Sequence, residues 1–222
     1  MIHGLTFKEY VEEEKTKLSE MTKAEKIDYF KEYYLKLTIV LFIVLVLIVW
    51  FVIDIARNMK NDVVTGGVVN TVLSTEGRTY LSDDYLNYLQ LSSRKNRANL
   101  APDIFLDGDD PQAYTIFQAE IATNSYNYII SDEKGLDFVA KNECAADMNE
   151  VLPGDLKSEF KDKMIYRKSG ESDTEIAAAI DITDTAFVKD FIIGDRVYFV
   201  ISGKIEEYDS GIAILRYILE KK

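Results

Sequence analysis

The chain has 222 residues, a formal net charge of −12, one cysteine and one histidine. The negative charge belongs to residues 61–222, which contain 17 Lys and Arg against 29 Asp and Glu, and this field excludes nucleic acid as a partner because phosphates require basic patches. Cys144 is the only cysteine, so an internal disulfide is excluded. The membrane topology expected below places Cys144 and the only histidine, His3, on opposite sides of the membrane, and this excludes Cys/His catalysis.

The first 36 residues predict two helices that each begin at a capping box, in which a hydroxyl and a carboxylate satisfy free amide groups. The boxes are Thr6 with Glu9 and Thr22 with Glu25. We expect one helix over residues 7–18 and a second from Lys23 through Tyr34 into the next segment, because no Gly or Pro intervenes. Its apolar face of Ile27, Phe30 and Tyr34 could lie along a membrane surface or bind a partner helix.

Residues 37–56, which begin at Leu37 and end at Ala56, hold only two polar residues. As a helix they would reach roughly 30 Å, the depth of the hydrocarbon of a bilayer. We therefore expect a transmembrane signal anchor whose partner is the lipid bilayer. The interior carries no charge, Pro or Gly, which favours an anchor over a transporter helix.

The orientation of this span follows from the basic residues beside it. Four lysines precede it and two basic residues follow it: Lys23, Lys26, Lys31 and Lys36, then Arg57 and Lys60. We expect a single-pass protein of the cell membrane with a cytoplasmic N-terminus. The predicted organisation is a cytoplasmic helical segment over residues 1–36, the signal anchor over 37–56, and an extracellular domain over 61–222.

The outer segment has the length of one globular domain, and strand-like and helix-like periods alternate along it. Strands are predicted over residues 63–73, 127–130, 164–166, 176–182 and 197–201, with a short extended piece at 104–106. Helices are predicted from Ser82 to Leu91, from Asp110 and Pro111 to Thr123, from Asp132 to Lys141, after Pro153, from Thr183, and over residues 208–219. Gly66 and Gly67 indicate a bulge or a close backbone approach. The alternation predicts an α/β fold with one mainly parallel sheet.

Polar residues follow two of these strands. In an open α/β sheet, ligands bind at the carboxyl ends of the strands. Asp132 follows the strand at residues 127–130, and Asp181, Thr183 and Asp184 lie at the end of the strand at 176–182. We expect these four residues to face one crevice as the ligand-binding site. The alternative is that they only cap the helices that follow.

An acidic loop invites a calcium interpretation, but its spacing opposes it. Its carboxylates are Asp103, Asp107, Asp109 and Asp110. Counted from Asp107, a calcium loop would require Gly at the position of Gln112 and Glu at that of Gln118. A turn at Gly108 followed by a helix cap explains the cluster, so we expect no metal site.

Three short strings imitate the motifs of serine transpeptidases and β-lactamases. They are Ser92 to Lys95 as S-x-x-K, Ser125 to Asn127 as S-Y-N, and Lys168 to Gly170 as K-S-G. That chemistry requires the lysine one turn along a helix that starts at the serine, whereas the predicted helix ends here. Ser202, Gly203 and Lys204 lack the preceding glycine of a P-loop, and no G-x-G-x-x-G occurs, so we expect no cofactor.

Two segments carry a resemblance to a known family: NYIISDEKGLDFVAKNECAADMNEVLPGDL at residues 127–156 and AIDITDTAFVKDFIIGDRVYFVISGKIEEYDSGIAILRYIL at 179–219. They resemble extracellular solute-binding proteins of the type 2 periplasmic-binding class, in which a strand ends in a polar residue and a helix, an apolar and acidic stretch and an LP pair follow. With the anchor and the segments FKEYVEEEKTKL and EKIDYFKEYY, the chain resembles uncharacterised single-pass membrane proteins of Gram-positive bacteria that carry a reduced domain of this kind. The resemblance implies the fold of one lobe and transfers no binding residue.

The sequence therefore predicts a membrane-anchored extracytoplasmic binding module without catalytic activity, whose ligand is a small solute or another envelope protein. The alternative is a structural or assembly partner of a larger membrane complex. An exposed apolar face of Ile212, Leu215 and Leu219 on the terminal helix would favour that alternative. A serine transpeptidase-like enzyme is the remote alternative.

Overall fold

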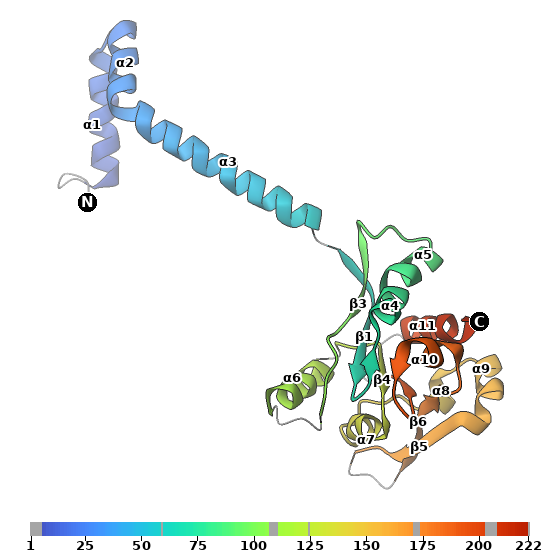
Figure 1. Ribbon diagram of the computed structural model, residues 1–222. Coiled ribbons are helices and arrows are strands. Elements are labelled where there is room, and N and C mark those ends of the chain that lie inside the picture. The colour runs from blue at the N-terminus through green and yellow to red at the C-terminus, as the bar shows by residue number, and fades with distance from the viewer. Residues whose placement is uncertain are drawn as a thin grey trace. The chain divides into compact units, whose positions relative to one another are not determined.

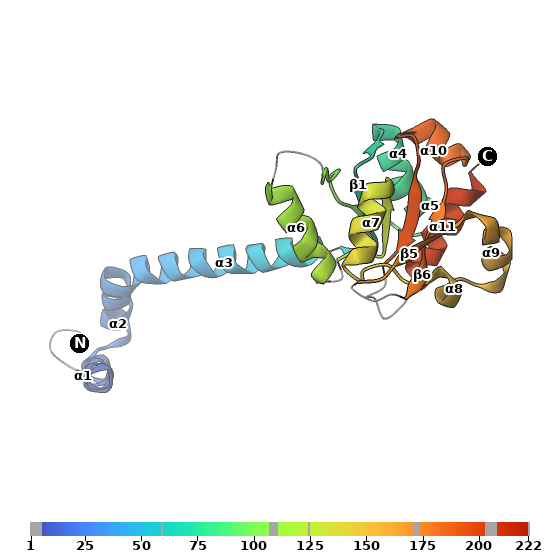
Figure 2. The same cartoon turned by 90° about the horizontal axis from the view of Figure 1, so that it is seen from below.

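The computed structural model describes residues 6–58, 60–106, 111–123, 125–170, 174–202 and 208–221. The chain divides into two compact units, Met1–Met59 and Lys60–Lys222. Figure 1 and Figure 2 label the helices and strands of each unit.

The first unit is helical. Its elements are α1 (Phe7–Glu20), α2 (Lys23–Tyr29), the π-helical turn η1 (Phe30–Tyr34) and α3 (Leu35–Asn58). Both predicted capping boxes are present, because Thr6 and Thr22 accept hydrogen bonds from the amides of Glu9 and Glu25. As predicted, the second helix continues without a break. From Lys23 to Ile55 it is long and apolar enough to span a membrane, and it is the one such helix in the described part of the chain.

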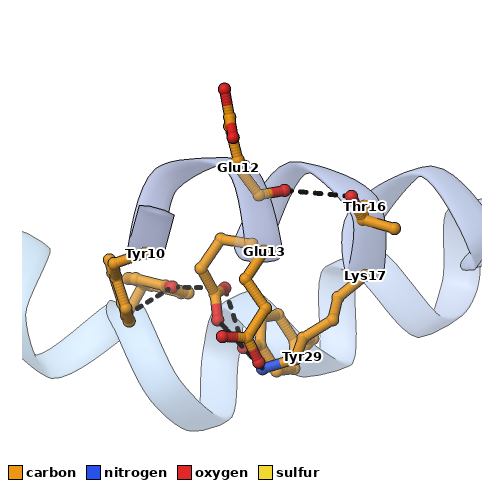
Figure 3. Close-up of polar contacts among 8 residues, drawn as sticks. Tyr10, Glu12, Glu13, Thr16, Lys17 and Tyr29 are labelled. Carbon is orange, nitrogen blue, oxygen red and sulfur yellow. Dashed lines mark hydrogen bonds and ion pairs between the residues drawn. The ribbon is translucent and has the colours of Figure 1, made fainter. Parts of the chain in front are cut away.

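A polar cluster joins α1 to the segment that precedes the apolar helix. Tyr29 and Tyr34 donate hydrogen bonds to Oε2 of Glu14 at 2.9 and 2.7 Å, and Lys17 Nζ lies 3.1 Å from Glu13. Figure 3 shows Tyr10, Glu13 and Lys17 of α1 against Tyr29 of α2. The Tyr34 bond is the main cause that holds the pKa of Glu14 below its usual value.

The π-helical turn explains how two tyrosines reach one carboxylate. In a straight α-helix, residues 29 and 34 would lie about 140° apart around the axis. The wider turn of η1, with its i→i+5 bonds, brings them to one side. The helix that Tyr34 contacts is therefore α1 of the same chain, while Ile27 and Phe30 stay 56% and 45% exposed.

The second unit is built on a six-stranded sheet in the order β3-β1-β4-β8-β6-β5 among the described residues. The strands are β1 (Asn61–Val69), β3 (Asn96–Leu100), β4 (Tyr128–Ser131), β5 (Met164–Lys168), β6 (Glu175–Asp181) and β8 (Tyr198–Ile201). β1 pairs in parallel with β3 and β4, and the other neighbours pair antiparallel. Strands β3, β1, β4 and β6 thus share one direction, which confirms an α/β fold with a mainly parallel sheet.

Helices cover both faces of this sheet (Figures 1 and 2). One face carries α4 (Thr75–Thr79), η2 (Tyr80–Asp84), α5 (Tyr85–Tyr88), α8 (Met148–Val151), α9 (Gly154–Glu159), α10 (Ala186–Phe191) and α11 (Asp209–Glu220), and the other carries α6 (Pro111–Ala122) and α7 (Glu133–Lys141). Side chains alternate accordingly, since Ile130 and Phe199 pack in the first layer and Ile129 and Val200 in the second. The short strands β2 (Val72–Leu73) and β7 (Ile192–Ile193) form a separate pair, and η3 (Lys161–Lys163) precedes β5.

Several predicted elements differ from the structure. The strand expected over residues 63–73 is divided at Asn70 and Thr71, where the chain leaves the main sheet. The helix expected from Ser82 begins earlier, with Ser74 as its cap, because Ser74 accepts the amide of Gly77 whereas the Ser82 hydroxyl donates to a carbonyl within the helix. The helix expected from Thr183 begins at Ala186 and is capped by Thr185.

Two further expectations concern single residues. Gly66 has no room for a side chain, because a Cβ there would collide with the ring of Tyr128, so the close approach at this glycine is made by an aromatic ring. Asp110, the expected cap of α6, lies outside the described residues, and α6 begins at Pro111. The Cys144 side chain is buried.

Candidate functional site

Four strands end or begin at one edge of the sheet. Val69 of β1 pairs with Ser131 of β4, Ser131 pairs with Tyr198 of β8, and Tyr198 pairs with Asp181 of β6. From β1 the chain continues to β3 on one side, and from β4 it continues to β5 and β6 on the other. The carboxyl ends of β1 and β4 are therefore a topological switch point, where open α/β sheets form ligand crevices.

A crevice of about 470 Å³ lies at this switch point. Three segments far apart in the sequence line it: Asn70 and Thr71 after β1; Asp132, Glu133 and Lys134 at the start of α7; and Gly194, Asp195 and Arg196 before β8. Its volume lies within the range of small-molecule sites.

Asn70 forms the turn at which the crevice opens. Its backbone adopts a left-handed conformation with φ of 54°, which Asn tolerates better than most residues. Its side-chain amide donates to Oδ1 of Asp132 at 3.2 Å, and its Oδ1 accepts the amide of Leu106 at 2.7 Å. Asn70 thereby turns the chain out of the sheet and fixes the Asp132 carboxylate.

Thr71 supplies an unusual group to the crevice wall. The residue is 2% exposed, and its hydroxyl oxygen has no hydrogen-bond partner among the described residues. The hydroxyl of Ser131, in the same edge row, is also buried without a partner there. Because an unsatisfied buried hydroxyl costs about 1–3 kcal/mol, such groups in a native structure call for an explanation.

Charges of both signs surround the crevice. Its lining includes three carboxylates and two cations: Asp132, Glu133, Asp195, Lys134 and Arg196. A hydrogen bond to Tyr198, with the nearby charges of Glu133 and Asp181, holds the pKa of Arg196 above its usual range. The first turn of α7, where the helix dipole is positive, also lies at this edge. There Oδ1 of Asp132 accepts the backbone amide of Gly135 at 2.8 Å.

The four residues predicted to bind a ligand reach the same edge of the sheet but not the same crevice. Asp132 lines the crevice and also caps α7. Asp181 ends β6 and accepts the amide of Thr183 at 2.9 Å, while the Thr183 hydroxyl accepts the amide of Val197 at 3.0 Å. Asp184 has an 81% exposed side chain that lies 3.9 Å from Lys163. Three of the four are thus placed as turn or surface residues outside the lining.

None of the described residues of the other sequence motifs lines the crevice. Ser92 and Lys95 belong to a turn between α5 and β3, and no helix starts at Ser92. Of the acidic loop, Asp103 pairs with Arg78 at 2.6 Å, and Asp107, Asp109 and Asp110 lie outside the described residues, as do Gly203 and Lys204.

Sequence reasoning missed most of the crevice: Asn70, Thr71 and the segment at residues 194–196. The available signal was the polar pair Asn70–Thr71 inside an otherwise Val-rich stretch.

We compared the chain with protein-family models, curated proteins and solved structures, and none of them matches it.

Proposed function

We propose that this chain is a single-pass membrane protein whose outer domain binds a small polar solute at the switch-point crevice, without catalytic activity of its own. The crevice between β1 and β4, with the unpartnered Thr71 hydroxyl in its wall, carries the proposal. The anchor is residues 37–56, the N-terminus is cytoplasmic, and residues 61–222 lie outside the cell.

The anchor is supported by the exposure of the apolar helix. Within the helical unit, the large apolar side chains from Leu37 to Ile55 are 44–64% exposed, which in water would leave a large apolar surface uncovered. Lipid removes that cost. The four lysines that precede the helix support the cytoplasmic N-terminus.

A polar solute is supported by the chemistry of the lining. The crevice offers carboxylates that accept hydrogen bonds, cations that donate them, and a buried hydroxyl that can do both. The Thr71 hydroxyl oxygen is buried in the unliganded domain, so a solute with donors and acceptors would satisfy it only after the Thr71 side chain turns toward the crevice, and that gain exists only in the bound state. The resemblance of residues 127–156 and 179–219 to one lobe of the type 2 periplasmic-binding class supports the same proposal.

The apolar surface that would favour an assembly partner is not exposed on α11. Leu215 on α11 is fully buried, and Ile212 and Leu219 pack against the same core. The apolar face that would have docked to a complex is therefore covered by its own domain. The enzyme alternative lacks a helix at Ser92, as described above.

The test is a thermal-shift screen of the detergent-solubilised full chain against a metabolite library. A true ligand at about 100 times its Kd adds about 2.7 kcal/mol, which for a domain of this size raises Tm by about 5 to 10 °C. Arg196→Gln should abolish the shift. Arg216→Gln, which removes an arginine from α11 on the surface, is the matched control and should retain it.

If no compound shifts Tm, solute binding is rejected. If a shift survives unchanged in Arg196→Gln, binding at this crevice through Arg196 is rejected. The topology has a separate test, because protease added to intact cells should digest the domain after the apolar helix. Protection of that domain would reject the proposed orientation.

A further inference from the structure

The outer domain is acidic as a whole but carries a local group of exposed cations where β1 and β3 begin. Four exposed cations form this group, the basic corner: Lys60, Arg94, Lys95 and Arg97. Asp62 is the carboxylate beside them, and it is held by Arg97 through two bonds of 2.7 and 3.0 Å. Residues 61–222 as a whole carry 29 acidic against 17 basic groups, so the corner differs in sign from its domain.

A compact turn holds two of these cations together. The carbonyl of Ser92 accepts the amides of Lys95 at 3.1 Å and Asn96 at 3.0 Å, and also the Asn96 side chain at 3.1 Å. Arg94 and Lys95 lie inside this turn, and neither side chain has an ion-pair partner within the described ranges. The turn therefore holds the backbone of two adjacent cationic residues, whose exposed side chains are available to an anion.

The same turn is fastened to the start of the domain. The amide of Asn61 donates to the carbonyl of Lys95 at 2.8 Å, and Asn61 is in register with Asn96 where β1 and β3 lie side by side (Figure 1). Asn61 follows Asn58, the last residue of α3, by three residues, which span at most about 11 Å. The covalent connection alone therefore keeps Lys95 close to the end of the apolar helix in any orientation of the domain.

We infer that the basic corner binds the phosphate groups of anionic lipids around the anchor and so orients the outer domain on the membrane. This inference rests on the proposed membrane anchoring. Each cation near an anionic surface strengthens the contact by about fivefold, while the acidic remainder of the domain is repelled. Opposite signs on one domain select a single orientation, with the corner toward the headgroups.

The experiment uses the full chain in lipid nanodiscs with a fluorescent label on Ser93→Cys. Cys144 is buried, and the labelled parent chain without this substitution measures its background. Quenching by a nitroxide on the lipid headgroup reports how often the turn contacts the surface. Because the short connection keeps the turn near the surface in both lipids, the readout is the difference: we expect stronger quenching with about 30 mol % phosphatidylglycerol than with phosphatidylcholine alone. About 0.5 M sodium chloride should remove the difference.

Charge variants separate a specific contact from general attraction. Arg94→Gln with Lys95→Gln should lower the ratio of surface-bound to free domain about 25-fold. The matched control, Lys161→Gln with Lys189→Gln, removes the same charge from exposed positions in η3 and α10 and should keep the quenching. Equal quenching in both lipids, unchanged quenching in the Arg94 and Lys95 variant, or an equal loss in the control would overturn the inference. If the chain does not insert into the nanodiscs, both the proposed membrane anchor and this inference are rejected.

Discussion

Replacement of Thr71 by Val tests whether the crevice is built at the expense of stability. The change removes a hydroxyl that is buried without a partner and keeps the branched shape of the side chain. An unsatisfied hydroxyl costs about 1–3 kcal/mol, so Val should stabilise the unliganded domain by about 1 to 2 kcal/mol. For a domain of this size that corresponds to a rise in Tm of about 2 to 8 °C.

The assay must report on the outer domain alone. The single tryptophan, Trp50, lies in the apolar helix, so its fluorescence follows the wrong unit. Near-ultraviolet circular dichroism of the tyrosines is suitable when the variant is compared with the parent chain, because the four tyrosines of the first unit are the same in both, while Tyr85 and Tyr128 are almost completely buried in the outer domain. Ser131→Ala is the companion variant, since it removes the second unpartnered hydroxyl from a residue outside the crevice lining.

The two variants should agree in stability and differ in binding. Both should raise Tm in the absence of ligand, but only Thr71→Val should lose the shift caused by a compound from the screen. A lower Tm for Thr71→Val would show that solvent satisfies the hydroxyl in the native state. A ligand shift of equal size in that variant would remove Thr71 from the binding site.

Three further changes test the packing around these features. Gly66→Ala should lower the free energy of unfolding by about 1 to 3 kcal/mol, because the new methyl group collides with the buried ring of Tyr128; an unchanged urea midpoint would contradict this. Asn70→Asp should lower the free energy of unfolding by about 1 to 3 kcal/mol at pH 7, because a second carboxylate then faces Asp132 and the amide donor is lost. Urea melts should show that part of this stability returns near pH 3. A loss that is the same at both pH values would exclude charge repulsion as its cause. Glu14 has a lowered pKa in the folded chain, so its contribution to the packing of α1 is complete above about pH 4.3 and disappears as the pH falls through the lowered value. Hydrogen exchange of the α1 amides, corrected for the intrinsic rate, should become faster as the pH falls through this value, and Tyr34→Phe should make that change smaller. Exchange protection of α1 that does not depend on pH would contradict the assignment.

Local signals in the sequence predicted the elements that begin at a capping side chain or at a first-turn proline. Both capping boxes, the start of α7 after Asp132 and the start of α6 at Pro111 depend on neighbouring residues only, so a pattern is sufficient. β3 was not predicted, because its sequence NRANL shows no alternation of apolar residues. As an edge strand it is stabilised by parallel pairing with β1, which is a tertiary contact.

The break after β1 was missed for a related reason. Residues 63–73 are rich in Val, and a strand pattern continues across Asn70 because β2 resumes it two residues later. What divides the two strands is the left-handed turn at Asn70, fixed by bonds to Asp132 and Leu106 from other parts of the chain. No local signal reports those partners.

The direction of one strand explains which site residues the sequence could reveal. Residues at the carboxyl ends of strands were predicted to form the site, and of these Asp132 lies in the lining of the switch-point crevice. β8, however, runs antiparallel to β4 and β6, so its amino end lies at that same edge. The segment before it therefore brings Asp195 and Arg196 into the crevice, whereas Asp181 and Thr183 are used to hold that segment in place. Arg196 is exposed and sits before the strand, so Arg196→Gln should remove ligand affinity while the sheet stays folded, and its loss of binding would connect the reversed strand directly to function.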